Sequence, residues 1–225
     1  MPVLDLRVPS PFKASWERQG ILGCWNWLKD AWKERAKNST HLYLSTVHPA
    51  VFPHLKRRPF VFSPSLLFFR SGRETAILGP LRRLALDCYL KYNEALASGD
   101  MKAIRDVARD PIAQEAETKI KKLTTSGTKL VWTYHGEAKK TQCVSYRHVP
   151  DAGIGVTGPR AGIQQVLVQF VTLQSLAVYD KNGKLLRGNP KSPKKVTDFY
   201  VFEFRGWDTE GWRMKARLFE PTEPN

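Results

Sequence analysis

The chain has 225 residues, 42% of them hydrophobic, which is enough to bury the core of one substantial domain and excludes a wholly disordered protein. It carries 36 Lys and Arg against 21 Asp and Glu, and the net charge of +15 predicts an anionic partner, either nucleic acid or an acidic membrane surface. Three scattered cysteines exclude a disulfide framework and a CxxC-type zinc site, and no apolar run is long enough to cross a bilayer.

Residues 1–80 are predicted to form a basic N-terminal extension. They do not have the pattern of a compact domain, because they hold eight of the fifteen prolines and four of the seven tryptophans. Within the extension, residues 15–37 have apolar side chains at helical spacing and predict one amphipathic helix. Trp25, Leu28 and Trp32 fall on one stripe of this helix. The stripe is a candidate for docking on a partner protein or on a membrane surface, and the alternative is a helix that folds back on the chain's own core.

A second basic feature of the extension lies in the Pro-punctuated stretch from residue 46 to residue 70. There Lys56, Arg57 and Arg58 stand between apolar patches. An extended cationic stretch suits a tail that follows phosphates along a large assembly.

The compact domain is predicted over residues 81–220 and is followed by a short tail, residues 221–225. It opens with three helices. Gly99 provides the left-handed residue that ends the first helix, and Asp100 provides the cap that begins the second. The three helices are expected over residues 81–98, 101–107 and 111–123.

Alternating apolar and β-branched residues then predict an antiparallel sheet with one apolar face and one partly basic face. Lys139 and Lys140 mark a hairpin between its first two strands, and Asn182-Gly183 marks a later one. In the last strand, alternate side chains are expected to share the apolar face, namely Trp212, Met214, Ala216 and Leu218. The strands are expected over residues 129–135, 141–149, 163–174, 176–179, 196–204 and 212–219.

Helices followed by a curved antiparallel sheet make an α+β fold. The order of the elements resembles the cone-shaped fold of the nuclear transport factor two-like family. Within that family the chain is similar to a mitochondrial branch: the C-terminal domain of the import-motor tether, protein forty-five of the mitochondrial large ribosomal subunit, and the fungal inner-membrane mitoribosome receptor. The resemblance covers residues 82–220 and is carried by Tyr89, Gly99-Asp100, Arg147-His148-Val149, Gln165 to Phe170, Asp180, Gly183, Val196 to Glu203 and Gly211 to Met214.

The resemblance implies a structural component of the mitochondrial large ribosomal subunit, near the polypeptide exit. The implied partners are mitochondrial ribosomal RNA and neighbouring large-subunit proteins, with the inner-membrane surface and its insertion machinery as further partners. It implies a location in the mitochondrial matrix, on the ribosome and peripheral to the inner membrane, with any presequence removed or lying before Met1. The main alternative is an inner-membrane import or assembly factor that binds proteins rather than RNA.

A small-molecule isomerase or dehydratase of the same fold is a further alternative. Its candidate acids, bases and hydrogen-bond donors are His135, Tyr134, Tyr146, His148, Asp151 and Asp198. The sequence has no P-loop, GxSxG, HExxH or dinucleotide-binding motif, so we predict no enzyme, no cofactor or metal, and no small-molecule substrate. RNA contact is predicted instead through lysines and arginines outside regular elements, which bind phosphates without reading bases. The predicted RNA-binding residues are Lys56, Arg57, Arg58, Lys139, Lys140, Lys191, Lys194 and Lys195.

Overall fold

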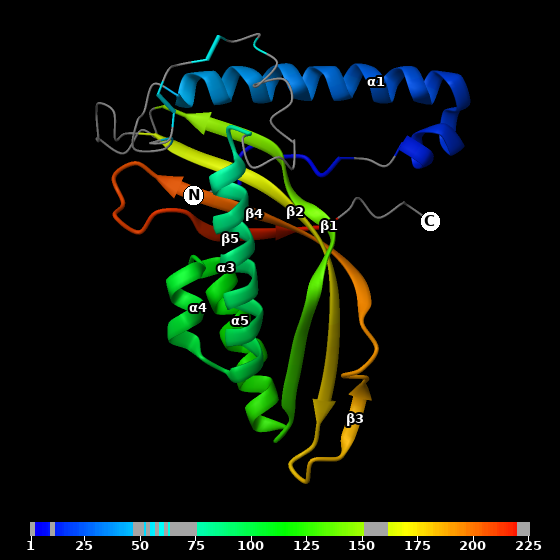
Figure 1. Ribbon diagram of the computed structural model, residues 1–225, viewed down its shortest axis with the longest axis vertical. Helices are drawn as coiled ribbons and strands as arrows, with labels where there is room; N and C mark the ends of the chain where they lie inside the picture. Colours follow the sequence, from blue (N-terminus) through cyan, green and yellow to red (C-terminus); the bar gives the residue numbers. More distant parts are fainter. Residues whose placement is uncertain are drawn as a thin grey trace.

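The computed structural model describes residues 3–9, 12–46, 52, 55–56, 59–60, 63, 76–150 and 162–219 (Figure 1). Three helices lie against one face of a curved antiparallel sheet, and a long helix crosses one end of that sheet (Figure 1). This is the α+β layout that the sequence predicts. The elements are α1 (Phe12–Ser45), α3 (Gly79–Ser98), α4 (Met101–Val107), α5 (Asp110–Thr125), β1 (Lys129–Val149), β2 (Ile163–Tyr179), β3 (Leu185–Gly188), β4 (Lys194–Arg205) and β5 (Arg213–Leu218).

The ends of α3, α4 and α5 follow the local signals in the sequence. Gly99 ends α3 in the left-handed region, at φ 78°. The Asp100 side chain then accepts hydrogen bonds from the backbone N–H groups of Lys102 and Ala103, both at 3.0 Å, and caps α4. Pro111 occupies the first turn of α5, where its missing N–H costs nothing. The predicted boundaries of these helices are confirmed to within two residues.

The sheet has the strand order β1-β2-β4-β5, with β3 paired to the end of β2. The two strands predicted over residues 129–135 and 141–149 are one strand, β1, so the hairpin predicted at Lys139 and Lys140 is wrong. β1 pairs with β2 along its length and shifts register at several points between Tyr134 and Ser145. Each shift adds an unpaired residue that bends the strand. The polar stretch that reads as a turn in the sequence is therefore a bulged segment that curves the sheet.

The main core lies between the sheet and the helices α3, α4 and α5. The ring of Tyr89 in α3 stacks on Phe170 of β2, with the ring centroids 4.3 Å apart. Phe202 of β4 is completely buried beside Phe170. Val166 and Val168 of β2 belong to the same core, which confirms the predicted alternation of that strand.

The opposite face of the sheet has an apolar cluster of its own, which corrects the prediction of one apolar and one partly basic face. Where β4 pairs with β5, the register shifts between Val201 and Phe202 of β4, so Lys215 of β5 has no paired residue. Because of this bulge, Trp212 and Met214 pack in the main core, whereas Ala216 and Leu218 pack in the second cluster. The second cluster is covered by residues 3–9, whose buried Leu6 lies against its members Val144, Leu167, Phe199 and Val201.

The N-terminal extension also contributes to the main core. Leu42 of α1 and Phe52 are both buried there. Helix α1 is longer than the predicted 15–37 and is broken at Gly20, whose φ of 56° and ψ of −130° favour glycine. The division of the chain at residue 80 stays a prediction, but Leu6, Leu42 and Phe52, which lie before it, are buried in the two apolar clusters of the compact domain.

Candidate nucleic-acid and partner interfaces

Six basic side chains gather around the β2–β3 hairpin and the loop that leads into β4, at the end of the molecule far from α1 (Figure 1). All six are exposed, and between residues 176 and 197 the sequence contains a single acid before Asp198, namely Asp180. Three of the six were predicted to bind RNA, and sequence reasoning missed the other three, Lys181, Lys184 and Arg187. The Asn182-Gly183 turn could have indicated them, because Lys181 and Lys184 stand directly on either side of it. The hairpin cluster consists of Lys181, Lys184, Arg187, Lys191, Lys194 and Lys195.

The hairpin holds these cations on a well-defined backbone. The Asp180 carboxylate accepts hydrogen bonds from the backbone N–H groups of Asn182 and Lys184, both at 2.8 Å, and Gly183 takes φ 80°. At the other end of β3, Gly188 takes φ 86°, and a Cβ atom there would clash with the carbonyl oxygen of Leu176. The sequence thus requires glycine both at the turn and at the point where β3 approaches β2 closely.

The other predicted RNA-binding residues do not join the hairpin cluster. Lys139 and Lys140 are exposed on the edge strand β1, which lies on the other side of β2 from β4. Lys56 is exposed next to Leu55, which packs against the main core. Its predicted companions, Arg57 and Arg58, lie outside the described residues.

The predicted docking stripe of α1 faces away from the sheet. The side chains of Trp25, Leu28 and Trp32 are 67%, 42% and 56% exposed, and Ile21 and Leu22 extend the stripe. Large exposed apolar patches are unusual on monomers and are typical of surfaces that contact another molecule. The tryptophan stripe consists of Ile21, Leu22, Trp25, Leu28 and Trp32.

Cations border the tryptophan stripe. At 100° per residue, Lys29 and Lys33 lie along one flank of it and Arg35 along the other. The Arg35 guanidinium stands 5.7 Å from the centre of the Trp32 ring. The acid Asp30 lies on the opposite side of the helix.

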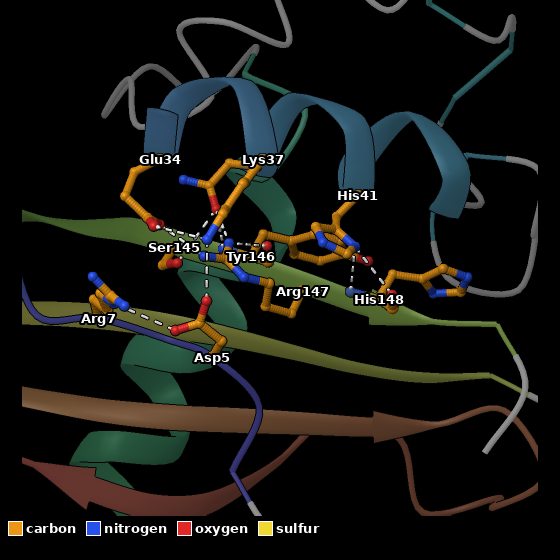
Figure 2. Close-up of polar contacts among 10 residues, drawn as sticks. Asp5, Arg7, Glu34, Lys37, His41, Ser145, Tyr146, Arg147 and His148 are labelled. Atoms are coloured by element: carbon orange, nitrogen blue, oxygen red, sulfur yellow. Dashed lines mark hydrogen bonds and ion pairs between the residues drawn. The ribbon is translucent and has the colours of Figure 1, made fainter. Parts of the chain in front are cut away.

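The opposite side of α1 is anchored to β1 by polar contacts (Figure 2). Arg147 is almost fully buried and donates to Glu34 Oε2 at 2.7 Å and to Asn38 Oδ1 at 2.6 Å. About two turns further along α1, the hydroxyl of Tyr146 donates to Ser45 Oγ at 2.8 Å. The alternative prediction, a helix folded back on the chain's own core, therefore holds for this side of α1 and not for the tryptophan stripe.

His41 lies in the same junction, where its Nδ1 is 3.1 Å from the carbonyl oxygen of His148 (Figure 2). Burial lowers the pKa of His41, and the charges of Arg147 and Lys37 act in the same direction. Lys37 also pairs with Asp5 of the N-terminal segment at 3.2 Å. The junction thus joins α1, β1 and the segment that covers the second cluster.

A cavity of about 880 Å³ opens between α3 and the strands, and Arg187 and Lys194 of the hairpin cluster stand among its lining residues. Asp198 lies in it, accepts a hydrogen bond from the hydroxyl of Tyr89 at 2.7 Å and pairs with Arg217 at 2.6 Å. Burial raises the pKa of Tyr89, and the neighbouring carboxylate raises it further. Both oxygens of the Asp198 carboxylate are therefore engaged by other side chains of the protein.

Of the other candidate acids and bases, Asp151 lies outside the described residues and the two histidines do not lie beside Asp198. His135 Nε2 lies 2.9 Å from Ser175 Oγ, and His148 lies beneath α1; neither lines the cavity. Across the described ranges, no group of three or more His, Cys, Asp or Glu side chains is placed to hold a metal ion. None of the helices in the same ranges combines the length and apolar character that a membrane span requires.

Comparisons with known proteins identify relatives of this chain. Large ribosomal subunit protein mL45 of Bos taurus is 38% identical over 61 residues, and mL45 of Caenorhabditis elegans is 38% identical over 64 residues. Each match covers 27% of this chain, and the chain spans about a fifth of each relative, 20% and 18%. The crystal structure of the intermembrane space region of chloroplast protein ARC6 aligns at a TM-score of 0.40 and 13% identity, covering 61% of this chain and 94% of that one. The model of the Tim44-like domain matches residues 80–217. The chain therefore belongs to the Tim44-like domain family, with the nuclear transport factor two-like fold that its sequence predicts.

Proposed function

We propose that this chain is a structural component of the mitochondrial large ribosomal subunit and that the hairpin cluster binds ribosomal RNA. The similarity to two mL45 proteins, whose name makes them large-subunit proteins, is the observation that carries the proposal. The hairpin cluster supports it, because six exposed cations and one acid over residues 176–197 form a surface suited to phosphates. Mobile lysine side chains on loops contact the backbone of RNA without reading its bases. We expect binding that depends strongly on salt and weakly on sequence.

The same relatives support a non-enzymatic role. Asp198, a candidate base in the cavity, is paired with Arg217 and hydrogen-bonded to Tyr89. None of the described histidines lines the cavity. The fold positions these groups to hold α3 on the sheet, which is a structural task.

Sedimentation of mitochondrial extract through a sucrose gradient tests the ribosomal proposal. We expect the chain to migrate with the large subunit, and migration only with smaller membrane complexes would favour an import or assembly factor.

A second experiment tests the hairpin cluster. Lys181, Lys184 and Arg187 are replaced together by Gln, and the affinity for large-subunit ribosomal RNA is measured at increasing salt concentrations. The slope of log affinity against log salt should decrease by about 2–3, since each phosphate contact contributes about 0.7–0.9. Replacing Lys102, Lys121 and Lys122 by Gln is the matched control, because it removes the same charge from exposed helix positions.

We further propose that the tryptophan stripe lies on the surface of the inner membrane, on the matrix side. The stripe is exposed, carries two tryptophans, and is flanked by Lys29, Lys33 and Arg35. Tryptophan rings favour the headgroup region, and cations beside them favour an anionic lipid surface. Because the polar junction with β1 holds the other side of α1, the stripe would stay on the outside of the molecule while the hairpin cluster contacts RNA.

A further inference from the structure

A second basic site lies at the opposite end of β4 from the hairpin cluster. It is a pocket of about 450 Å³ between the start of α5, the turn that joins β4 to β5, and β5 itself. Arg109 lines it and is tied to β5 by a backbone hydrogen bond from its N–H to the carbonyl oxygen of Met214, at 2.8 Å. Arg213 and Lys215 reach the pocket from β5.

The donors of this pocket are only partly used by the protein. Arg109 is 8% exposed, and its Nη2 has no hydrogen-bond partner in the described part of the chain. The buried Nε of Arg213 likewise has none among those residues. Lys215 is 6% exposed, and its ammonium group forms no ion pair or hydrogen bond with any described residue. A buried donor without a partner costs free energy comparable to a lost hydrogen bond, so the two unpartnered guanidinium donors at one pocket indicate a missing acceptor. The Lys215 ammonium adds a cation that the described residues leave without a counterion there.

The acids around the pocket engage other parts of the same cations. Asp208 and Glu210 accept from Nη1 of Arg109 at 3.1 and 3.4 Å, and Glu203 lies 3.2 Å from its Nε. Glu210 also pairs with Nη1 of Arg213, at 2.8 Å. These contacts hold the guanidinium planes in place and leave Nη2 of Arg109, Nε of Arg213 and the Lys215 ammonium for a ligand. The remaining charged lining residues are Arg105, Arg205 and Asp110.

We propose that this pocket binds an oxyanion, and that its natural ligand is a phosphate group of the ribosomal RNA backbone. A phosphate has four oxygens and can accept from donors that converge from several directions, whereas a carboxylate presents two oxygens in one plane. Three free donors on two different elements suit the phosphate. The proposal rests on the proposed function for the identity of the ligand. It extends that function by placing a buried, fixed phosphate contact at the other end of the sheet from the exposed lysines.

Thermal unfolding tests the site with inorganic phosphate as the probe. Phosphate should raise the unfolding midpoint of the unchanged chain above its value in chloride or acetate at matched ionic strength and pH, since a ligand that binds the folded state stabilises it. Lys215→Met, which removes the ammonium group and keeps an unbranched side chain one atom shorter, should lose this response. Lys91→Met, the same change at an exposed position of α3, should keep it. Arg213→Gln is a second variant in case Lys215→Met does not fold. Equal responses of the Lys215 and Lys91 variants, or of phosphate and acetate, would overturn the site.

Binding of large-subunit ribosomal RNA tests the ligand. Lys215→Met should lower the affinity about tenfold and reduce the salt slope by about 1, while Lys91→Met changes neither as much. A phosphate response that disappears without any change in RNA affinity would overturn the assignment to RNA and indicate an acidic partner protein. If the unchanged chain does not bind RNA, the ribosomal proposal and the RNA assignment fail together, and the phosphate response still decides whether the pocket binds an oxyanion.

Discussion

The three cysteines differ in burial and therefore in the expected reactivity of their thiols. Burial raises the pKa of Cys143 to about 12 and that of Cys88 to about 11, so both are protonated thiols at neutral pH. Cys24, on α1, is only partly buried. Since the thiolate is the reactive form, a thiol reagent at pH 8 should modify Cys24 first and leave Cys143 intact until the chain unfolds. Mass spectrometry of the labelled chain checks this, and early modification of Cys143 would contradict the described core.

The pKa of His41 predicts how stability changes with pH. Because burial holds the folded pKa below the ordinary value of 6.5, the unfolded chain takes up a proton at His41 before the folded chain does. Stability should therefore fall as the pH drops below about 6.5, and above that pH His41 should contribute no slope.

Replacing His41 by Gln should flatten this dependence. Denaturant unfolding midpoints at pH 7.5, 6.5 and 5.5 measure it; the three values are about one unit apart around the ordinary histidine pKa. Asp5, whose pKa is lowered first of all by its hydrogen bond to Lys37, loses its contribution at still lower pH and so falls in a separate window. An unchanged slope in His41→Gln would show that His41 is not the group that titrates.

Single residues were predictable where one local signal decides the outcome. The cap at Asp100 and the left-handed Gly99 were confirmed because such signals act within a few residues. The pairing of Arg147 with Glu34 could not be predicted, because the two residues are 113 positions apart and nothing local marks either one. The same holds for the free donors around Arg109, which depend on where the β4–β5 turn folds.

At the level of elements, the β2–β3 hairpin offers a matched pair of substitutions. Gly183→Ala and Gly188→Ala both place a side chain at positive φ, a cost of about 1–2 kcal/mol. At Gly183 the added Cβ meets open space, whereas at Gly188 it clashes with the carbonyl oxygen of Leu176. Only Gly188→Ala should push β3 off β2 and displace Arg187 and its neighbours.

We expect Gly188→Ala to weaken RNA binding several-fold, although it removes no charge, and Gly183→Ala to bind nearly as the unchanged chain does. Amide hydrogen exchange of residues 185–188 should rise in Gly188→Ala alone. If the two variants bind RNA equally, the shape of the hairpin does not matter and the lysines act as a diffuse charge.

The faces of the strands show where prediction from periodicity ends. Alternation correctly assigned the side chains of β2 and β4 to the two faces of the sheet, because the pairing of these two strands has no register shift. It failed for β5, where one bulge exchanges the faces between Met214 and Ala216. It also split β1 in two, because bulged residues and turn residues share the same polar composition. A bulge is set by the curvature of the whole sheet, which a pattern of period two does not contain.

On the scale of the whole molecule, the proposed contacts lie far apart. The hairpin cluster lies at one end and α1 crosses the other (Figure 1). The helical spacing of Trp25, Leu28 and Trp32 predicted a stripe, but only the structure shows that α1 is anchored by its opposite side. The reason is that the anchor is polar and includes Asn38 and Arg147, which hydrophobic periodicity does not register.

The two proposed contacts, with lipid and with RNA, would form at opposite ends of the molecule, and vesicle flotation of the full chain tests the lipid contact. The unchanged chain should float with vesicles that contain an anionic lipid such as cardiolipin and much less with neutral ones, because Lys29, Lys33 and Arg35 contribute about 1 kcal/mol each near an anionic surface. Trp25→Ser combined with Trp32→Ser should reduce flotation by at least tenfold, since both indole rings that would lie in the headgroup region are removed.

Leu185→Ser combined with Leu186→Ser is the matched control, because it removes two exposed apolar side chains from the other end of the molecule. Equal flotation of the two double variants would show that the tryptophan stripe does not contact lipid. Undiminished co-migration of the tryptophan variant with the large subunit, together with lost flotation, would show that α1 serves the membrane and that the rest of the molecule binds the ribosome.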